Sequence, residues 1–210
     1  MNFKRVLVLS PHTDDGEYGA GGTIARLVKE GAEVHYIAFS APTEELKEEC
    51  TKATKLLGVK TMTAMNFPRR RLHEHRQDIL QTLYELDKKL KPDLVLVPSR
   101  MDIHQDHNVV TEEASRGIFL HSTILGYELP HNIRVFNQVV GISSDNLKKK
   151  TFALSQYKSQ IERYYFDSDF IHSWARFRGG QINAGYAECF EVIKAVEMLS
   201  SRKGESEDRA

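Results

Sequence analysis

The chain has 210 residues, with 29 basic and 29 acidic side chains and therefore no formal net charge. This length suits one sizeable α/β domain and is short for two. The balanced charge gives no general attraction to nucleic acid or to an anionic membrane, and no apolar run approaches the roughly 20 residues that span a bilayer. We therefore expect neither a nucleic-acid partner nor a membrane span.

The two cysteines, Cys50 and Cys189, are far apart in the chain. They form neither a disulfide framework nor a metal-spaced pair, which is typical of a protein in a reducing compartment. The N-terminus leads into a short apolar strand and not into a signal-peptide core. We expect a cytoplasmic protein. The sequence leaves the oligomeric state open, a homo-oligomer included.

The first half of the chain alternates strand-like and helix-like segments. Short apolar runs bounded by turn residues predict strands at residues 4–10, 33–39, 59–65 and 94–97. Helical spacing of apolar residues predicts helices at residues 18–30, at residues 44–57 and from about residue 76 to Leu90. This alternation predicts an α/β fold, a Rossmann-like open and mostly parallel sheet with helices on both faces.

The second half is less regular. It predicts helices at residues 109–119, 145–156, 161–165 and 192–200, and strands near residues 123–128, 133–140 and 186–190. No internal repeat or composition change marks a domain boundary before residue 201. We therefore expect a single domain over residues 1–200 and a charged, disordered tail over residues 201–210.

Two polar loops follow the first and the fourth predicted strands. Their side chains suited to chemistry are His12, Asp14 and Asp15 in the first loop, and His104 and His107 in the second. In a doubly wound sheet of order 3-2-1-4-5, strands 1 and 4 are neighbours at the switch point where ligands bind. The topology therefore predicts that both loops line one crevice.

The residue types in these loops are those of a catalytic metal site. Two imidazoles and a carboxylate, with a fourth coordination position left open for water, are a known ligand set of catalytic zinc. We assign His12, Asp15 and His107 as ligands of Zn²⁺, with Fe²⁺ as the alternative metal. Asp14 is then a base for a metal-activated water, and His104 an acid for a departing amine. This apparatus suits the hydrolysis of an amide.

Simpler roles exist for the same residues. Aspartates before a helix can cap its first turn, although both carboxylates are not explained in this way. His104 and His107 could flank a helix start that Asp106 caps. The glycine-rich stretch of residues 19–22 lacks the spacing of a phosphate-binding loop, and we expect it to allow close packing of the first helix.

The two loops resemble those of the PIG-L/LmbE-like zinc-dependent N-acetylglucosaminyl de-N-acetylases. The matching motifs are Pro11-His12-Thr13-Asp14-Asp15, Gly21-Gly22-Thr23-Ile24-Ala25 and Asp102-Ile103-His104-Gln105-Asp106-His107. Weaker similarity covers Phe67-Pro68 with Arg69-Arg70-Arg71, Tyr157-Lys158-Ser159-Gln160, and Arg178-Gly179 with Tyr186-Ala187-Glu188. The resemblance extends over roughly residues 4–190. It implies a Rossmann-like fold and removal of an acetyl group from an N-acetylglucosamine unit.

By match of motif, the resemblance gives the loop residues the same roles as above, with His104 as acid or oxyanion stabiliser. The chain departs from the family at Thr13, where proline is usual, and this change removes no ligand. Candidate substrate-binding residues are Arg70, Arg71, Glu17 and Arg178. Bidentate arginine suits a phosphate-bearing or polyhydroxyl substrate. The cluster of residues 69–71 could equally be a solvated charged segment, and Glu17 could anchor the loop.

These features predict a metal-dependent hydrolase that removes the N-acetyl group from an N-acetylglucosamine-type sugar or sugar conjugate, a small-molecule substrate. One alternative is an amidase that cleaves a thiol-sugar conjugate. Another is a non-catalytic sugar-binding module on the same fold. The presence of both Asp14 and His104 disfavours the module, because neither residue is needed to hold a ligand.

Overall fold

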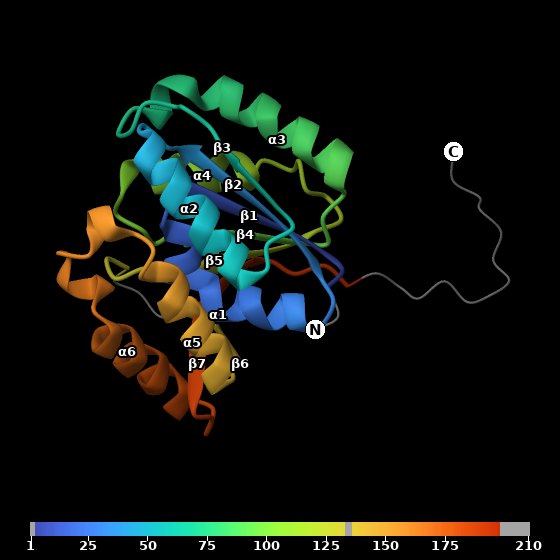
Figure 1. Cartoon of the computed structure of the whole chain (residues 1–210). Coiled ribbons are helices and arrows are strands. Elements are labelled where there is room, and N and C mark those ends of the chain that lie inside the picture. Colours follow the sequence, from blue (N-terminus) through green and yellow to red (C-terminus); the bar gives the residue numbers. More distant parts are fainter. Residues whose placement is uncertain (1–2, 133–135, 198–210) are drawn as a thin grey trace, which may run out of the picture.

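The computed structural model describes residues 3–132 and 136–197. Its core is a seven-stranded sheet of order β3-β2-β1-β4-β5-β7-β6 (Figure 1). The strands are β1 (Arg5–His12), β2 (Glu33–Ser40), β3 (Thr61–Ala64), β4 (Leu94–Pro98), β5 (Thr123–Tyr127), β6 (Gln138–Ile142) and β7 (Tyr186–Lys194). The first five strands in this order are parallel, and β7 is antiparallel to both of its neighbours. The predicted Rossmann-like α/β class and the 3-2-1-4-5 order are confirmed.

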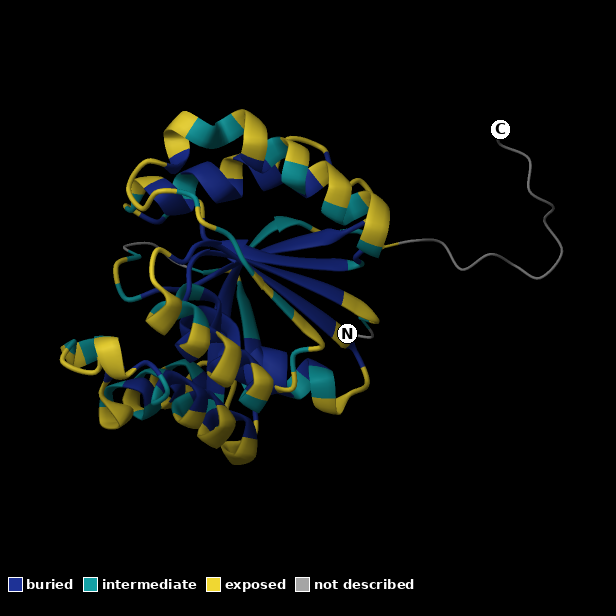
Figure 2. Ribbon diagram, turned by 45° about the horizontal axis from the view of Figure 1, so that its top comes forward, coloured by how far each residue is buried: buried dark blue, intermediate teal, exposed yellow. Residues whose placement is uncertain are grey.

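Helices cover both faces of this sheet (Figure 2). One face carries α1 (Asp15–Lys29), α2 (Glu44–Leu57), α5 (Ser144–Leu154) and α6 (Ser168–Gly180), and the other carries α3 (Arg76–Leu90) and α4 (Gln105–Ala114). Side chains alternate along β1, so that Val6 and Val8 join one buried cluster while Leu7 and Leu9 join the other. A strand buried on both faces explains the continuous apolar run in the sequence.

Glycines in the first turns of helix α1 allow close packing of this helix against its neighbours. A Cβ atom at Gly16 would lie 2.7 Å from the Tyr36 ring, and one at Gly19 would lie 2.8 Å from Cγ of Tyr127. Neither position has room for a side chain. The glycine-rich stretch therefore serves helix packing, as the sequence predicts, and it brings the start of α1 close to the end of β1.

Several predicted elements differ from the observed ones. The predicted closing helix at residues 192–200 is wrong over its described part: β7 continues to Lys194 through its pairing with β5, and residues 195–197 form no helix. Residues 161–165 form parts of loops and a short 3₁₀ turn, η3 (Tyr164–Phe166), and not an α-helix. The strand predicted near residues 133–140 is β6, at residues 138–142. Residues 133–135 and the predicted tail at 201–210 lie outside the described residues.

Helix α6 has no counterpart among the predicted elements. It begins after Asp167, whose carboxylate accepts hydrogen bonds from the backbone of Asp169 and Phe170, 2.8 and 3.1 Å away. Two further 3₁₀ turns are η1 (Leu72–His75) and η2 (Lys158–Gln160). The segment from η2 to η3 passes beside the carboxyl end of β1, where it contributes to the site described below.

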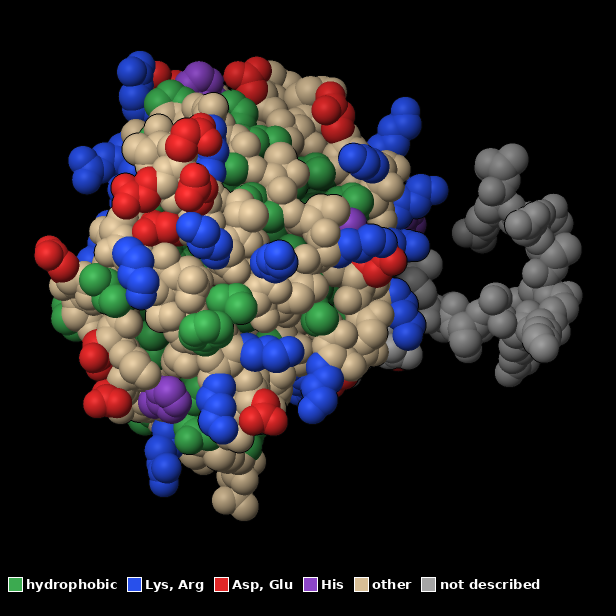
Figure 3. Space-filling model, viewed as in Figure 1, with side chains coloured by type: hydrophobic (Ala, Val, Ile, Leu, Met, Phe, Trp, Pro, Cys, Tyr) green, Lys and Arg blue, Asp and Glu red, His purple; other side chains and the backbone are tan. Residues whose placement is uncertain are grey.

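Within the described residues, no helix is long and apolar enough to cross a membrane. Acidic and basic side chains are interspersed over the face shown in Figure 3. This distribution agrees with the balanced charge of the whole chain.

Candidate active site

The two polar loops meet at the carboxyl ends of β1 and β4. His12 is the last residue of β1, and Asp15 is the first residue of α1. His104 and His107 lie at the start of α4, which follows β4. Because β1 and β4 are adjacent, all four side chains converge at the switch point of the sheet, as the topology predicts.

Three of these side chains form a compact triangle of donor atoms. Nδ1 of His12 lies 3.1 Å from Oδ2 of Asp15, and Nε2 of His107 lies 3.2 Å from the same oxygen. The two imidazole nitrogens are 3.3 Å apart. Ligands about 2.0–2.2 Å from a tetrahedral zinc ion are separated by about 3.3–3.6 Å. The donor types and their spacing therefore fit a zinc ion with small adjustments.

His104 offers a second way to complete such a site. His12, His104 and His107 each have a potential ligand atom within 4.8 Å of the others. However, Nδ1 of His104 accepts a hydrogen bond from the backbone N–H of Asp106 at 3.1 Å. That nitrogen is therefore engaged, and in the neutral ring the proton lies on Nε2.

Buried carboxylates hold the two candidate histidine ligands from behind. Oδ2 of Asp102 lies 3.0 Å from Nδ1 of His107, and Oδ2 of Asp106 lies 3.1 Å from Nε2 of His12. Metal-ligating histidines usually have such a partner, which fixes the tautomer and the ring orientation. Asp102 was not predicted in this role from the sequence, and Asp106 was expected only as a possible helix cap. The alternation of aspartate and histidine in residues 102–107 is the signal that could have indicated both.

Electrostatic interactions within the triangle are strong. Burial opposes the charged form of His107, but Asp15 and Asp102 outweigh it and raise the pKa of His107 to about 10. Burial also opposes ionisation of Asp15, yet the imidazoles of His107 and His12 hold the pKa of Asp15 well below its usual range. In the metal-free protein at neutral pH, His107 is therefore protonated on both ring nitrogens and positively charged, and Asp15 is negatively charged.

Asp14 lies beside the triangle and has no structural partner of its own on α1. It occupies the N-cap position, but its side chain makes no capping hydrogen bond. Burial raises the pKa of Asp14, and the negative charge of Asp15 adds to the rise. A carboxylate with a raised pKa is a better proton acceptor near neutral pH than an ordinary aspartate. The capping role considered for Asp14 is not the one observed.

His104 packs edge-on to His12 and stacks on His107, with ring centroids 4.8 and 4.5 Å apart. Burial lowers the pKa of His104 to about 4, and the positive charges of His107 and His12 contribute to this decrease. At neutral pH in the metal-free protein it is therefore a neutral ring with an N–H donor at Nε2. Such a donor can stabilise a developing negative charge on oxygen.

Glu17 is fully buried beneath the first loop. The hydroxyl of Tyr157 lies 2.7 Å from Oε1 of Glu17, and the hydroxyl of Tyr36 contacts Oε2. Both tyrosines also contact the carbonyl oxygen of Thr13. Of the two roles left open by the sequence, these contacts are those of a residue that anchors the loop. A proline at position 13 would supply the same carbonyl, which explains why threonine is compatible with this anchor.

The proton count of this network agrees with a neutral Glu17. Burial raises the pKa of Glu17 to about 8, so the carboxyl is protonated at neutral pH. Glu17 can then donate to Tyr157, which leaves the Tyr157 proton for the Thr13 carbonyl, while Tyr36 donates to Glu17. Each buried acceptor receives one donor in this arrangement.

The arginine cluster at residues 69–71 divides into three environments. The guanidinium of Arg71 pairs with Glu74, 2.6 and 2.9 Å away, on the exposed surface. Arg70 has a left-handed backbone with φ of 65°, and its N–H donates to Asp106 at 2.6 Å. Arg69 lines the cleft above His12 and Asp14. The predicted substrate residues Arg70 and Arg71 are thus not among those that line this cleft.

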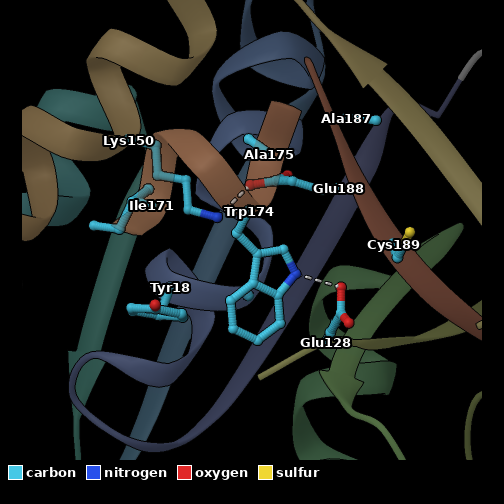
Figure 4. Close-up of a pocket in the computed structure, with 10 residues that line it drawn as sticks. Tyr18, Glu128, Lys150, Ile171, Trp174, Ala175, Ala187, Glu188 and Cys189 are labelled. Carbon is cyan, nitrogen blue, oxygen red and sulfur yellow. Dashed lines mark hydrogen bonds and ion pairs between the residues drawn. The ribbon is translucent and has the colours of Figure 1, made fainter. Parts of the chain in front are cut away.

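Arg178 is held in a different place. Its guanidinium pairs with Glu128, which also accepts a hydrogen bond from the indole N–H of Trp174 at 3.0 Å. Figure 4 shows Trp174 and Glu128 in a pocket between α6 and α1, opposite Tyr18. The pocket beside His12 and Asp14 shares no lining residue with this one.

Comparison with known proteins identifies the family of this chain. Residues 7–118, just over half of the chain, match the model of the PIG-L family, described as GlcNAc-PI de-N-acetylase. The matched segment contains both polar loops. The chain belongs to the PIG-L family. Its members are deacetylases, which hydrolyse an amide.

Relatives of this PIG-L protein agree with the assignment. The chain is 27% identical to an uncharacterized deacetylase, YaiS, of Escherichia coli K12, over 74% of this chain and 91% of the relative. It is 24% identical to a diacetylchitobiose deacetylase of Thermococcus kodakarensis, over 93% of this chain and 85% of the relative. The structure of the conserved protein TT1542 from Thermus thermophilus is similar, with a TM-score of 0.79 and 25% identity over 92% of this chain and 96% of that one.

Proposed function

We propose that this PIG-L protein is a zinc-dependent de-N-acetylase of N-acetylglucosamine-type sugars or sugar conjugates. The observation that carries the proposal is the triangle of His12, Asp15 and His107 with Asp14 beside it. The name of the Thermococcus relative, a diacetylchitobiose deacetylase, supports the choice of an acetamido sugar as substrate.

His12, Asp15 and His107 would hold the metal, with Asp106 and Asp102 fixing the two imidazoles from behind. When bound, zinc lowers the pKa of water and polarises a carbonyl oxygen. Fe²⁺ accepts the same nitrogen and oxygen ligands and is the alternative ion.

The other residues of the site would move and stabilise charge. Asp14 accepts the proton of the attacking water, for which its raised pKa suits it. The N–H donor at Nε2 of His104 stabilises the oxyanion that forms as water adds to the acetamide carbon. The proton that Asp14 has accepted is then available for the departing amine. The products are acetate and a free amino sugar.

An acetate-release assay tests this proposal. The zinc-loaded protein, the iron-loaded protein and the protein stripped by a chelator are each mixed with methyl N-acetylglucosaminide and with diacetylchitobiose. We expect acetate from the metal-loaded forms only, and recovery when zinc returns to the stripped protein. If the metal-loaded protein binds these sugars and releases no acetate, the non-catalytic alternative gains support and the proposal fails. If the protein releases a carboxylic acid only from a thiol-sugar conjugate and not from these sugars, the amidase alternative is favoured.

A further inference from the structure

A carboxylate on β7 holds the turn that leads into the second polar loop. We propose that Glu191 is a positioning residue of the candidate metal site. It fixes Ser99 and Arg100 at the end of β4, and with them the segment that presents His107. This inference rests on the proposed function, since it takes His107 as a ligand of the metal. Glu191 is none of the assigned ligands, and its contribution is to fix the loop that carries one of them.

Glu191 receives four donors from two consecutive residues of this turn. Its Oε2 accepts from the hydroxyl of Ser99 and from the backbone N–H of Arg100, each at 2.9 Å. Its Oε1 accepts from Nε and Nη2 of Arg100, each at 2.7 Å. The residue is buried, with 8% of its surface exposed. Hydrogen bonds to a buried carboxylate are among the stronger ones in a protein, so the turn is firmly held by a residue 92 positions after Ser99.

Gly126 of β5 makes room for this contact. Gly126 and Glu191 are partners in the antiparallel pairing of β5 with β7, so position 126 faces the same side of the sheet as the Glu191 side chain. A Cβ atom at Gly126 would lie 2.8 Å from Cα of Ser99. The backbone N–H of Ser99 also donates to the carbonyl of Tyr127 at 3.1 Å. The turn therefore lies directly against β5, and Glu191 reaches it from the adjacent strand.

Hydrogen bonds connect this turn to the candidate ligand. Oγ of Ser99 accepts from the N–H of Met101, and its carbonyl accepts from the N–H of Asp102, each at 3.1 Å. The carboxylate of Asp102 then accepts from the N–H of His104 at 2.8 Å, and its other oxygen lies 3.0 Å from Nδ1 of His107. An unbroken series of hydrogen bonds thus leads from β7 to His107. The groups behind a metal ligand influence the affinity of the site for the metal.

The alternative is that the pair of Glu191 and Arg100 only stabilises this end of the sheet. Glu128 provides a matched comparison, because it too is buried, with 8% of its surface exposed. Its carboxylate accepts from Nε of Arg178 and from the indole N–H of Trp174, each at 3.0 Å. Within residues 3–132 and 136–197, the Glu128 side chain makes no hydrogen bond to the second polar loop. Both carboxylates therefore contribute to stability, and only Glu191 is connected to the metal site.

The test compares zinc affinity with stability in Glu191→Gln and Glu128→Gln. Zinc affinity is measured by competition with a chelator, and stability by urea unfolding of the metal-free proteins. In Glu191→Gln one carboxylate oxygen becomes an NH₂ group, which cannot accept from Ser99 or Arg100. We expect zinc affinity to fall about tenfold, the lower end of the range for groups behind a ligand, because Glu191 acts from further away. Glu128→Gln should lose stability to a similar extent and keep the parental zinc affinity.

A milder variant keeps the test decisive if Glu191→Gln does not fold. Ser99→Ala removes the hydroxyl that joins Glu191 to Met101 and leaves the ion pair with Arg100 in place. Its zinc affinity should fall about two- to tenfold, the contribution of one net hydrogen bond. Parental zinc affinity in Ser99→Ala and in any folded Glu191→Gln overturns the inference, and so does an equal loss of zinc affinity in Glu128→Gln.

Hydrogen exchange of the metal-free proteins gives a readout that does not depend on zinc. The amides of Met101, Asp102 and His104 donate within the loop and should exchange faster in Glu191→Gln than in Glu128→Gln. A parent that binds zinc and releases no acetate contradicts the proposed function and leaves the role of Glu191 to be decided by the zinc affinities. Acetate release by the parent, together with parental zinc affinity and parental exchange in Glu191→Gln, contradicts only the positioning role.

Discussion

The carboxylate of Asp102 is the clearest place to test how the candidate metal site is held. Each of its oxygens serves one donor: Oδ1 accepts from the backbone N–H of His104 at 2.8 Å, and Oδ2 faces Nδ1 of His107 at 3.0 Å. In Asp102→Asn only one of these positions keeps an acceptor. The amide NH₂ group must then face either the N–H of His104 or Nδ1 of His107.

Both orientations of the new amide impair the site. If NH₂ faces the backbone of His104, a buried donor loses its acceptor at a cost of about 1–3 kcal/mol. If NH₂ faces His107, Nδ1 must accept and the proton of the neutral ring moves to Nε2, the atom assigned to the metal. We therefore expect zinc affinity to fall about 10–100-fold, which corresponds to about 1.4–2.7 kcal/mol.

Zinc affinity is measured by titration against a chelator of known affinity, with metal content checked by elemental analysis. The matched control is Asp93→Asn at the other end of β4, because Asp93 also accepts two backbone hydrogen bonds, from Lys4 and Arg5 at 2.7 and 3.0 Å. The control should lose stability and keep its zinc affinity. If Asp102→Asn binds zinc within twofold of the parent, the assigned support of His107 is wrong.

Three further outcomes follow from the buried groups of the site. Because His107 has a pKa of about 10 in the metal-free protein, zinc binding at pH 7.5 should release at least one proton, measured by calorimetry in buffers of different ionisation enthalpy; no release would contradict the charged pair with Asp15. Glu17 has a folded pKa of about 8 against 4.5 for the free side chain, so the folded state keeps a proton that the unfolded state loses as the pH rises from 5 to 8. The parent's free energy of unfolding therefore falls across that window, while the amide of Glu17→Gln does not titrate. In urea unfolding, Glu17→Gln should gain stability relative to the parent as the pH rises. A difference between the two unfolding free energies that stays constant with pH would refute the neutral carboxyl. Tyr157→Phe leaves the Thr13 carbonyl with fewer donors and should cost about 1–3 kcal/mol in the same assay, while an unchanged unfolding midpoint would show that the anchor carries no stability.

The sequence was most informative where local pattern and topology point to the same place. The buried run of β1 and the run of β4 are short, apolar and followed by polar loops, so their adjacency in a doubly wound sheet brings His12 and His107 together. Alternating strands and helices leave few other arrangements.

The C-terminal third was predicted less well because tertiary pairing decides it. Val192 and Ile193 are β-branched and favour a strand. The prediction joined them to the helix-like residues that follow, whereas the pairing of this end of β7 with β5 keeps them in the sheet. Helix α6 depends on an aspartate cap and on burial of Ile171 and Ala175 against the sheet. The sequence likewise does not show which arginine of the cluster lines the cleft. Arg69 and Arg71 have the same side chain, and it is the ion pair of Arg71 with Glu74 that separates them in the structure.

The central claim is that Asp14 moves the proton while the neighbouring triangle holds the metal. The most direct test is Asp14→Asn, assayed for zinc content and for acetate release from the best acetamido sugar. We expect zinc content equal to that of the parent and a rate lower by about 10²–10⁴, the usual contribution of a general base. A variant that retains zinc and releases acetate at the parental rate would contradict this division of roles.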